Sequence, residues 1–161
     1  MRIAVYPGSF DPITKGHLDI LKTGAEIFDK VIIAVAKNSE KKGFLSIEER
    51  VKLIKASVKD IENVEVDSFD GLTIEYAKKQ EAKVLIRGLR AVSDFEYELQ
   101  LSQANSALSS DIKTVFLTTK PKYNFISSST IKEIHLNNGD ISKFVPVSYT
   151  HLRAHETRGN L

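Results

Sequence analysis

Short runs of apolar residues alternate along this chain with longer segments whose apolar residues recur at helical spacing. The runs have the length of strands that are buried on both faces, which is typical of parallel sheets. They predict five strands, at residues 3–6, 31–36, 64–67, 83–87 and 114–118. Because parallel strands need helical crossovers, this order predicts an α/β fold: one doubly wound, Rossmann-like parallel sheet of five strands with helices on both faces.

Three of the segments between the strands carry an apolar stripe that would face the sheet. The stripes consist of Leu18, Leu21, Ala25 and Phe28, then Ile47, Val51, Ile54 and Val58, and then Tyr97, Leu101, Ala104 and Leu108. A serine followed three residues later by a glutamate can cap the free amides of a helix start. Such pairs, Ser46 with Glu49 and Ser93 with Glu96, mark the starts of the second and third of these helices.

Length and composition describe one ordinary domain: 161 residues, 42% of them hydrophobic. The 23 basic and 21 acidic residues are interspersed, which argues against a polynucleotide partner, and the chain has no cysteine. Its longest apolar run, residues 31–36, is far shorter than the ~20 residues of a membrane helix, and the N-terminus lacks a signal-peptide pattern. We therefore expect a cytoplasmic protein that binds neither nucleic acid nor membrane.

The segment between the first strand and the first helix, residues 6–17, is the most informative part of the chain. It runs from an apolar strand through a glycine and proline turn into a helix start. The first turn of a helix has unpaired N–H groups and a partial positive charge, which stabilise a bound anion such as phosphate. Ser9, Thr14 and His17 add side-chain donors to the same turn.

Three further loops follow predicted strands and carry groups that bind phosphate. Lys41 follows the second strand, residues 88–90 (Gly-Leu-Arg) follow the fourth, and the hydroxyl-rich residues 123–130 follow the fifth. In doubly wound sheets the ligand lies beyond the carboxyl ends of the strands. The loops therefore predict a polyphosphate ligand. They contain no matching cluster of carboxylates, so we expect no metal site formed by the protein alone.

Four motifs in this order resemble bacterial phosphopantetheine adenylyltransferases, over residues 1–146. They are Gly8-Ser-Phe-Asp-Pro12 with Thr14-Lys-Gly-His17, Val84-Leu-Ile-Arg-Gly-Leu-Arg90, Asp94-Phe-Glu-Tyr-Glu98 and Ile126-Ser-Ser-Ser129. The Thr-x-Gly-His element is shared by the nucleotidyltransferase superfamily, whereas the second and third motifs are more specific. The resemblance implies transfer of AMP from ATP to 4′-phosphopantetheine, giving dephospho-coenzyme A and pyrophosphate. It also implies Mg²⁺ accompanying the ATP and assembly as a homohexamer.

The resemblance also assigns roles to residues. His17, Lys41 and Arg90 would be catalytic, with His17 donating a hydrogen bond to the charge that grows during direct in-line attack. Ser9, Lys41, Thr73 and Arg87 would hold the phosphopantetheine. ATP would be bound by Ser9, Phe10, His17, Gly88, Leu89, Arg90, Glu98, Tyr123, Asn124, Phe125, Ile126, Ser127, Ser128 and Ser129. Two arginines at the end of a buried strand also need a partner, which a ligand or Glu98 can provide.

The sequence is also compatible with other functions and with purely structural roles for some of these residues. A cytidylyltransferase or a nicotinamide-mononucleotide adenylyltransferase would keep the His17 turn but would need other residues than 87–90. A nucleotide sensor without catalysis would keep the binding loops. Residues 127–130 alone are also a good helix cap, and Lys41 alone could be a solvated loop residue.

Residues 147–161 depart from the resemblance, since the family continues past Pro146 with a short helical segment. The tail holds two of the four histidines and two of the six arginines of a chain otherwise rich in lysine. We interpret it as foreign sequence, such as a cloning scar or a misread 3′ end, and we divide the chain into a nucleotidyltransferase domain, 1–146, and this tail. A replaced C-terminus can also alter subunit packing.

Overall fold

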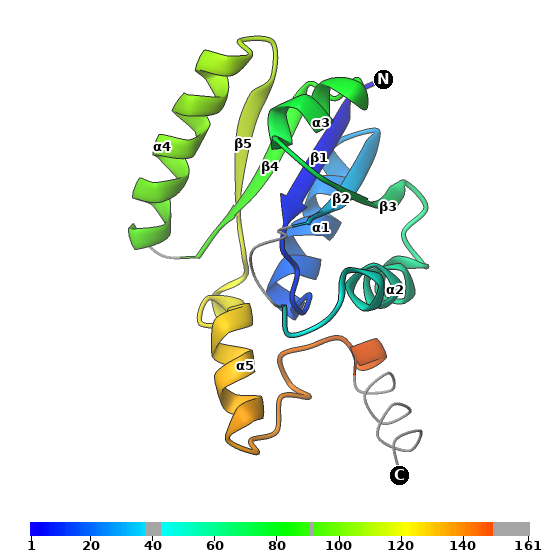
Figure 1. The fold of residues 1–161 in the computed structure, drawn as a ribbon, viewed down its shortest axis with the longest axis vertical. Helices are drawn as coiled ribbons and strands as arrows, with labels where there is room; N and C mark the ends of the chain where they lie inside the picture. Colours follow the sequence, from blue (N-terminus) through cyan, green and yellow to red (C-terminus); the bar gives the residue numbers. More distant parts are fainter. Residues whose placement is uncertain (38–42, 91, 150–161) are drawn as a thin grey trace.

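The computed structural model describes residues 1–37, 43–90 and 92–149, with the backbone alone for 92–94. Five parallel strands form one sheet in the order β3-β2-β1-β4-β5 (Figure 1). The strands are β1 (Ile3–Gly8), β2 (Lys30–Ala36), β3 (Val64–Phe69), β4 (Val84–Leu89) and β5 (Lys113–Thr118). The prediction of five parallel strands is confirmed, and the observed ends differ from the predicted ones by only one or two residues.

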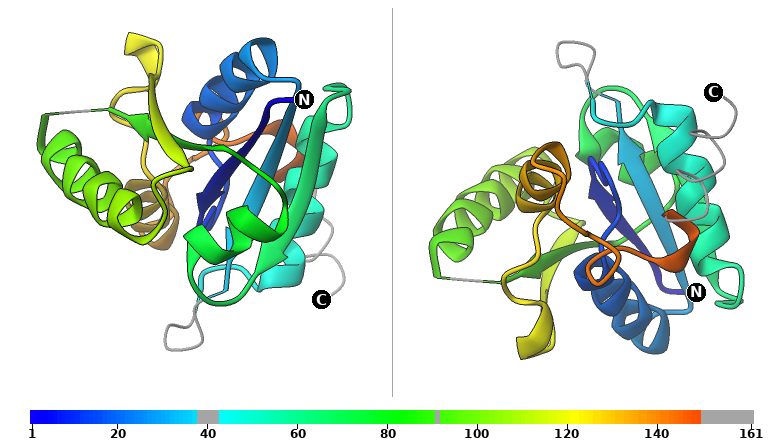
Figure 2. Two further views of the ribbon diagram at one scale, coloured as in Figure 1. Left: turned by 90° about the horizontal axis from the view of Figure 1, so that it is seen from above. Right: turned by 90° about the horizontal axis from the view of Figure 1, so that it is seen from below.

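Helices cover both faces of the sheet, as predicted (Figure 2). The helices are α1 (Lys15–Ile27), α2 (Ile47–Val58), α3 (Thr73–Lys79), α4 (Val92–Leu108), the 3₁₀ turn η1 (Pro121–Tyr123) and α5 (Ser128–Leu136). Helices α1 and α2 lie on one face, and α3 and α4 lie on the other. Helix α5 lies beyond the carboxyl ends of the strands (Figure 1).

Alternate residues of the central strands pack into separate cores on the two faces, because successive strand side chains point to opposite sides. Tyr6 and Ile33 belong to the larger core, which α1 and α2 cover. Val5 and Ile32 belong to the smaller core beneath α3. The strands therefore read as continuous apolar runs because both of their faces are buried.

The starts of the first two helices have the caps that anchor them. Thr14 is the N-cap of α1, and its hydroxyl accepts a hydrogen bond from the His17 amide. Ser46 and Glu49 form the predicted capping box of α2. No helix in the described part of the chain is long and apolar enough to cross a bilayer.

Helix α4 differs from the prediction in its start and in its apolar face. It begins at Val92, so Ser93 lies inside its first turn and is not its N-cap. The predicted stripe is also wrong as a core face, because Tyr97 is 63% exposed and Leu108 is 56% exposed. The apolar residues of α4 are distributed around the helix, which packs mainly against β4 and β5.

Candidate functional site

A cavity of about 300 Å³ lies beyond the carboxyl ends of β1 and β4. Strand order reverses at this position, since β1 connects forward to β2 on one side while β4 and β5 lie on the other. Ligands of doubly wound folds bind at this switch point. The cavity is lined by Tyr6, Pro7, Gly8, Ser9, Phe10, Thr14, Gly16, His17, Ile20, Arg87, Gly88, Arg90, Glu98, Thr119, Ile126, Ser127, Ser128 and Ser129.

Most of the residues that sequence reasoning selected meet in this one cavity. They come from the turn after β1, from the end of β4 with the start of α4, and from the segment that leads into α5. The selected residues that line it are Ser9, Phe10, His17, Arg87, Gly88, Arg90, Glu98, Ile126, Ser127, Ser128 and Ser129.

The ring of His17 is held by the capping box at the start of α1. The backbone N–H of Thr14 donates to His17 Nδ1 at 3.0 Å, while the His17 amide donates to Thr14 Oγ1 at 3.1 Å. Because Nδ1 uses its lone pair as an acceptor, a neutral ring carries its proton on Nε2. His17 therefore offers an N–H donor that is already oriented by the helix start.

Electrostatics keep this imidazole neutral. Burial lowers the pKa of His17 to about 4, and the positive charge of Arg90 lowers it in the same direction. The ring packs edge-to-face against Phe10, with centroids 5.0 Å apart. Phe10 is itself 2% exposed and has a left-handed backbone, φ 45°, a strained conformation that the surrounding packing must maintain.

Two arginines from the end of β4 have distinct partners. Arg87 forms a bidentate ion pair with Glu98, with Nε–Oε2 and Nη2–Oε1 distances of 2.6 and 2.8 Å. Burial opposes the charge of Arg87, but the Glu98 carboxylate outweighs it and raises the pKa of Arg87. Arg90 donates to the Ile126 carbonyl at 2.9 Å, which ties the end of β4 to the segment before α5.

The serine segment combines a structural role with a position in the cavity. Ser127 is the N-cap of α5, and its Oγ accepts the Thr130 amide at 3.1 Å. Ser128 Oγ donates to the Pro12 carbonyl at 3.0 Å and thereby joins α5 to the turn after β1. The helix-cap interpretation and the ligand interpretation are therefore compatible, since the capped end of α5 opens into the cavity.

A smaller pocket of about 130 Å³ adjoins the first, and Arg87 lines both. Thr73, predicted with Arg87 to bind phosphopantetheine, lies in this second pocket. The remaining lining residues are mostly apolar, and they are Pro7, Leu72, Ile74, Leu85, Leu101, Asn105 and Leu108. Sequence reasoning missed Leu101 and Asn105 as site residues, because their spacing on α4 resembles that of any amphipathic helix.

The structure does not place every predicted residue at this cavity. Lys41 is outside the described residues. Among those described, Leu89, Tyr123, Asn124 and Phe125 do not line the 300 Å³ cavity. Asn124 accepts a hydrogen bond from the hydroxyl of Thr119, which does line it. Phe125 is 62% exposed.

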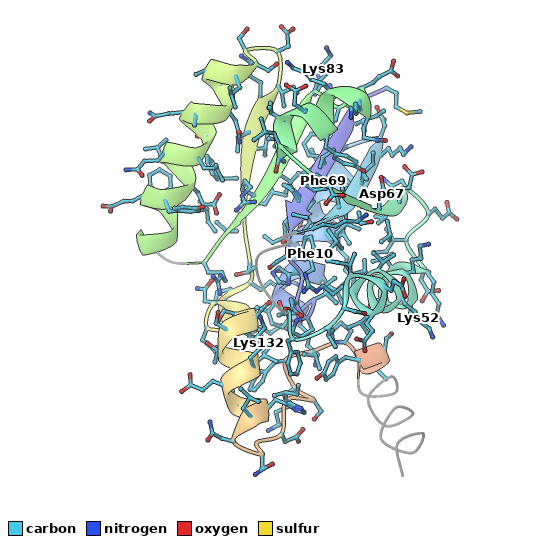
Figure 3. All side chains as sticks on the ribbon, viewed as in Figure 1. Phe10, Lys52, Asp67, Phe69, Lys83 and Lys132 are labelled. Carbon is cyan, nitrogen blue, oxygen red and sulfur yellow. The ribbon has the colours of Figure 1, made fainter. Side chains whose placement is uncertain are left out.

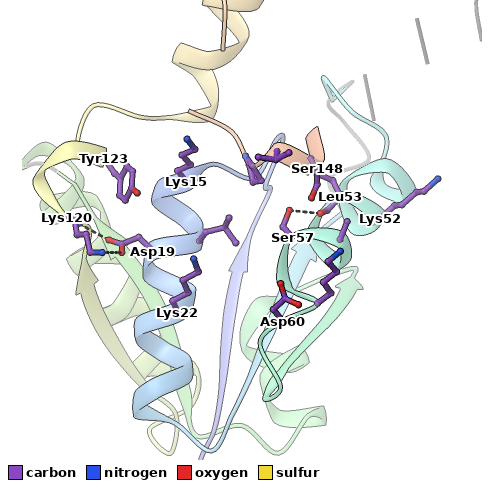
Figure 4. A pocket seen from close by; sticks show the side chains of 15 residues that line it. Lys15, Asp19, Lys22, Lys52, Leu53, Ser57, Asp60, Lys120, Tyr123 and Ser148 are labelled. Carbon is purple, nitrogen blue, oxygen red and sulfur yellow. Dashed lines mark hydrogen bonds and ion pairs between the residues drawn. The ribbon is translucent and has the colours of Figure 1, made fainter. Parts of the chain in front are cut away.

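A larger hollow, with a volume of about 880 Å³, lies between α1 and α2 (Figure 4). Lys15 and Lys22 from α1 and Lys52 from α2 lie around it, and Ser148 lies at one end. Tyr123 is the single predicted site residue among its described lining residues. The smaller cavity is the better candidate site because it brings oriented donors together at the switch point of the sheet.

Comparisons with known proteins show the family to which this chain is similar. Residues 5–134 match the family model described as cytidylyltransferase-like. Phosphopantetheine adenylyltransferases of Caldanaerobacter subterraneus and Clostridium novyi are each 56% identical over 146 residues, covering 91% of this chain and 91% of theirs. That of Lachnoclostridium phytofermentans is 57% identical over 148 residues, covering 92% of this chain and 91% of its own.

A solved structure shows the same fold at low sequence identity. It is a candidate nicotinate-nucleotide adenylyltransferase from Vibrio parahaemolyticus, with a TM-score of 0.71 and 20% identity. The alignment covers 94% of this chain and 99% of that one. The sheet order and its helical layers are therefore those of a solved nucleotidyltransferase fold.

The protonation of His17 can be tested directly by NMR titration of the ligand-free protein. We expect its ring to stay neutral until the pH falls to about 4, because burial beside Arg90 opposes a positive charge. The histidine of the unfolded chain takes up its proton near pH 6.5, so this residue makes the fold less stable as the pH falls from 6.5 towards 4. The variant His17→Gln identifies the signals, and a midpoint near 6.5 would contradict the expectation.

Proposed function

The chain belongs to the phosphopantetheine adenylyltransferase family, and we propose that it transfers AMP from ATP to 4′-phosphopantetheine, releasing pyrophosphate and forming dephospho-coenzyme A. The observation that carries this proposal is the meeting of His17, Arg90 and the serine segment in one cavity that adjoins an apolar pocket. Such an arrangement suits two phosphorylated substrates, one of which has an apolar arm. We place the reaction in the cytoplasm.

The chemistry needs alignment and charge stabilisation more than a covalent intermediate. An oxygen of the acceptor phosphate attacks the α-phosphorus of ATP, a new P–O bond forms, and the bond to the β-phosphate oxygen breaks. Negative charge grows on the α-phosphate oxygens, and the Nε2–H of His17 donates to it. A neutral ring serves this role without taking up or releasing a proton, and the fixed charge of Arg90 supports it.

The nucleotide side of the site is the cavity beside α5. The capped end of that helix provides hydroxyls and backbone amides for phosphate oxygens, and Arg90 is held next to it through Ile126. Glu98 contributes indirectly, because both of its carboxylate oxygens bind Arg87. Contacts of ATP with Leu89 and with residues 123–125 stay predictions.

The acceptor side is the smaller pocket. Arg87 lies at the junction of the two pockets, where it can bind the phosphate of phosphopantetheine, and Thr73 lies beyond it. Leu101 and Leu108 provide apolar surface for the pantetheine arm, and Asn105 provides a polar group for its amides. Ser9 and Lys41 stay predictions for the same substrate.

Magnesium fits this site as a companion of ATP. Within the described residues no group of three or more histidine or acidic side chains could hold a metal ion. Glu98 is the one carboxylate among the described residues that line the cavity, and Arg87 neutralises it. The phosphates of ATP would therefore supply the charge that binds Mg²⁺.

Pyrophosphate release provides the direct test of the activity. Purified protein supplied with ATP, Mg²⁺ and 4′-phosphopantetheine should release pyrophosphate and form dephospho-coenzyme A. Parallel reactions with CTP in place of ATP, or with nicotinamide mononucleotide as acceptor, should be inactive. Activity with CTP alone would indicate a cytidylyltransferase, and activity with nicotinamide mononucleotide alone would indicate a nicotinamide-mononucleotide adenylyltransferase. Binding of ATP without turnover would indicate a nucleotide sensor.

Replacing His17 by alanine should reduce kcat by about 10² to 10³, since one oriented donor to the transition state is lost. Loss of the capping box should cost only about 1 kcal/mol of stability. Steady-state kinetics and thermal unfolding measure the two effects. The matched control is His135→Ala, an exposed histidine on α5 whose ring packs edge-to-face against Phe44 with centroids 5.3 Å apart. It should leave kcat unchanged and also cost about 1 kcal/mol of stability. Near-normal turnover of the His17 variant would make that residue purely structural.

Replacing Leu101 by tryptophan should fill the pocket of about 130 Å³ and raise the KM for 4′-phosphopantetheine about tenfold or more. The KM for ATP should change less than about twofold, because the nucleotide binds in the other cavity. Leu136→Trp is the control, since Leu136 is 74% exposed at the end of α5. Equal changes in both KM values would place the pantetheine arm elsewhere.

We also propose that the protein assembles as a homohexamer, as the family resemblance implies. The support in this chain is the exposed apolar surface of α4, where Phe95, Tyr97, Leu99 and Leu108 are 39–63% exposed. Light scattering on the eluting protein should give six times the chain mass of 18.0 kDa. A monomer mass would contradict the proposed hexamer. It would not bear on the transfer reaction, which the pyrophosphate assay tests separately.

A further inference from the structure

Asp11 is a buried carboxylate at the turn after β1, and four groups from three other segments converge on it. The backbone N–H of Leu45 donates to Oδ1 and that of Phe44 to Oδ2, each at 2.7 Å. Arg50 Nη2 lies 3.3 Å and Lys132 Nζ lies 3.1 Å from Oδ2. Asp11 is 3% exposed, so these contacts replace the water that a carboxylate otherwise binds.

Arg50 extends this cluster towards the cavity. Its Nε donates to the Leu45 carbonyl at 2.9 Å, and its Nη1 donates to the Ser9 carbonyl at 3.3 Å. Arg50 is itself buried, with 7% of its surface exposed. The turn that carries Ser9 and Phe10 is therefore joined to the start of α2 through both the carboxylate and the guanidinium.

Lys132 extends the cluster to α5. It follows Ser129 by three residues, which places it about one turn along the helix from the serine segment. Figure 3 shows Phe10 at the carboxyl end of β1 and Lys132 on α5 below it. The ion pair of Lys132 with Asp11 and the hydrogen bond from Ser128 to Pro12 hold the start of α5 against the turn after β1.

We infer that Asp11 is a positioning residue, which holds the turn after β1, the start of α2 and the start of α5 in one arrangement for phosphate transfer. Neither Asp11 nor Lys132 is among the described residues that line the cavity. They act through Phe10 and His17 on one side and through the serine segment on the other. Because in-line transfer depends on the relative placement of these groups, loosening the link lowers kcat.

Removing Asp11 itself is an ambiguous test, because it would leave two buried or half-buried cations facing each other without a counter-charge. Lys132→Met is cleaner, since it cuts only the link to α5 and leaves Asp11 bound to Arg50, Phe44 and Leu45. The lysine side chain is 35% exposed, so the fold should tolerate the change.

Lys30→Met is the matched control. Lys30 is 36% exposed and pairs with Glu65 at 2.9 Å, but it lies at the start of β2, at the opposite end of the sheet from the cavity. Both variants thus lose an ion pair of a half-exposed lysine, and they differ in the partner carboxylate, which is buried in Asp11 and exposed in Glu65. A difference between their activities reports the position of the pair and not the general loss of a surface interaction.

We expect kcat of Lys132→Met to fall about tenfold, with a Tm only slightly below that of Lys30→Met, because Arg50 and two backbone amides still compensate the buried Asp11. The kcat of Lys30→Met should stay at the wild-type value. Lys132→Arg should restore most of the activity, because it keeps the ion pair. The double variant Asp11→Asn with Lys132→Met should lose no more activity than Asp11→Asn alone, since both changes break one link.

The inference rests on the proposed function, and different results would contradict the function and the positioning role of Asp11. If the wild-type protein releases no pyrophosphate, the proposed function is wrong. If the wild type is active and Lys132→Met keeps kcat within about twofold, the positioning role of Asp11 is wrong. Losses that multiply independently in the double variant would overturn it as well.

Discussion

The position of β1 in the middle of the sheet is the constraint on which the site depends. With β2 and β3 on one side and β4 and β5 on the other, right-handed crossovers place α1 and α2 on one face and α3 and α4 on the opposite face. The chain segments that leave β1 and β4 must therefore diverge. The crevice between them receives helix starts and strand ends whose side chains line one cavity, where doubly wound folds bind their ligands.

Within this crevice the charges are arranged so that few groups need to take up or release a proton when a ligand binds. Arg87 is neutralised by Glu98, and His17 is kept neutral by burial and by Arg90. Hydroxyls and helix amides supply the remaining donors. A polyphosphate brought into such a site meets donors that are already oriented, so little reorganisation accompanies the growth of charge in the transition state. The strained backbone of Phe10 is maintained by packing against Tyr6 and His17.

Helix α4 connects the site to the outside of the molecule. Leu101, Asn105 and Leu108 line the smaller pocket, while Phe95 and Tyr97 are 43% and 63% exposed. The sheet covers this helix only in part, so several of its large apolar side chains are exposed in the single chain, which is unusual for a monomeric protein. The stripe predicted for residues 92–108 was wrong because apolar residues at helical spacing do not show whether that face meets the sheet.

The sequence alone determined the elements and selected most of the polar residues that line the cavity. The strands, the first two helix stripes and the caps of those helices depend on residues close together in the chain, so local patterns were sufficient for them. The turn at residues 6–17 carried its own signal of a phosphate site. The tertiary structure decided what depends on distant partners. The neutral state of His17 needs Arg90 and burial, and the role of Asp11 needs Phe44, 33 residues away, and Lys132 on α5. The free energy of burying a charged group depends on the residues that folding places beside it. These residues are distant in the chain, so they leave no periodic pattern in the sequence.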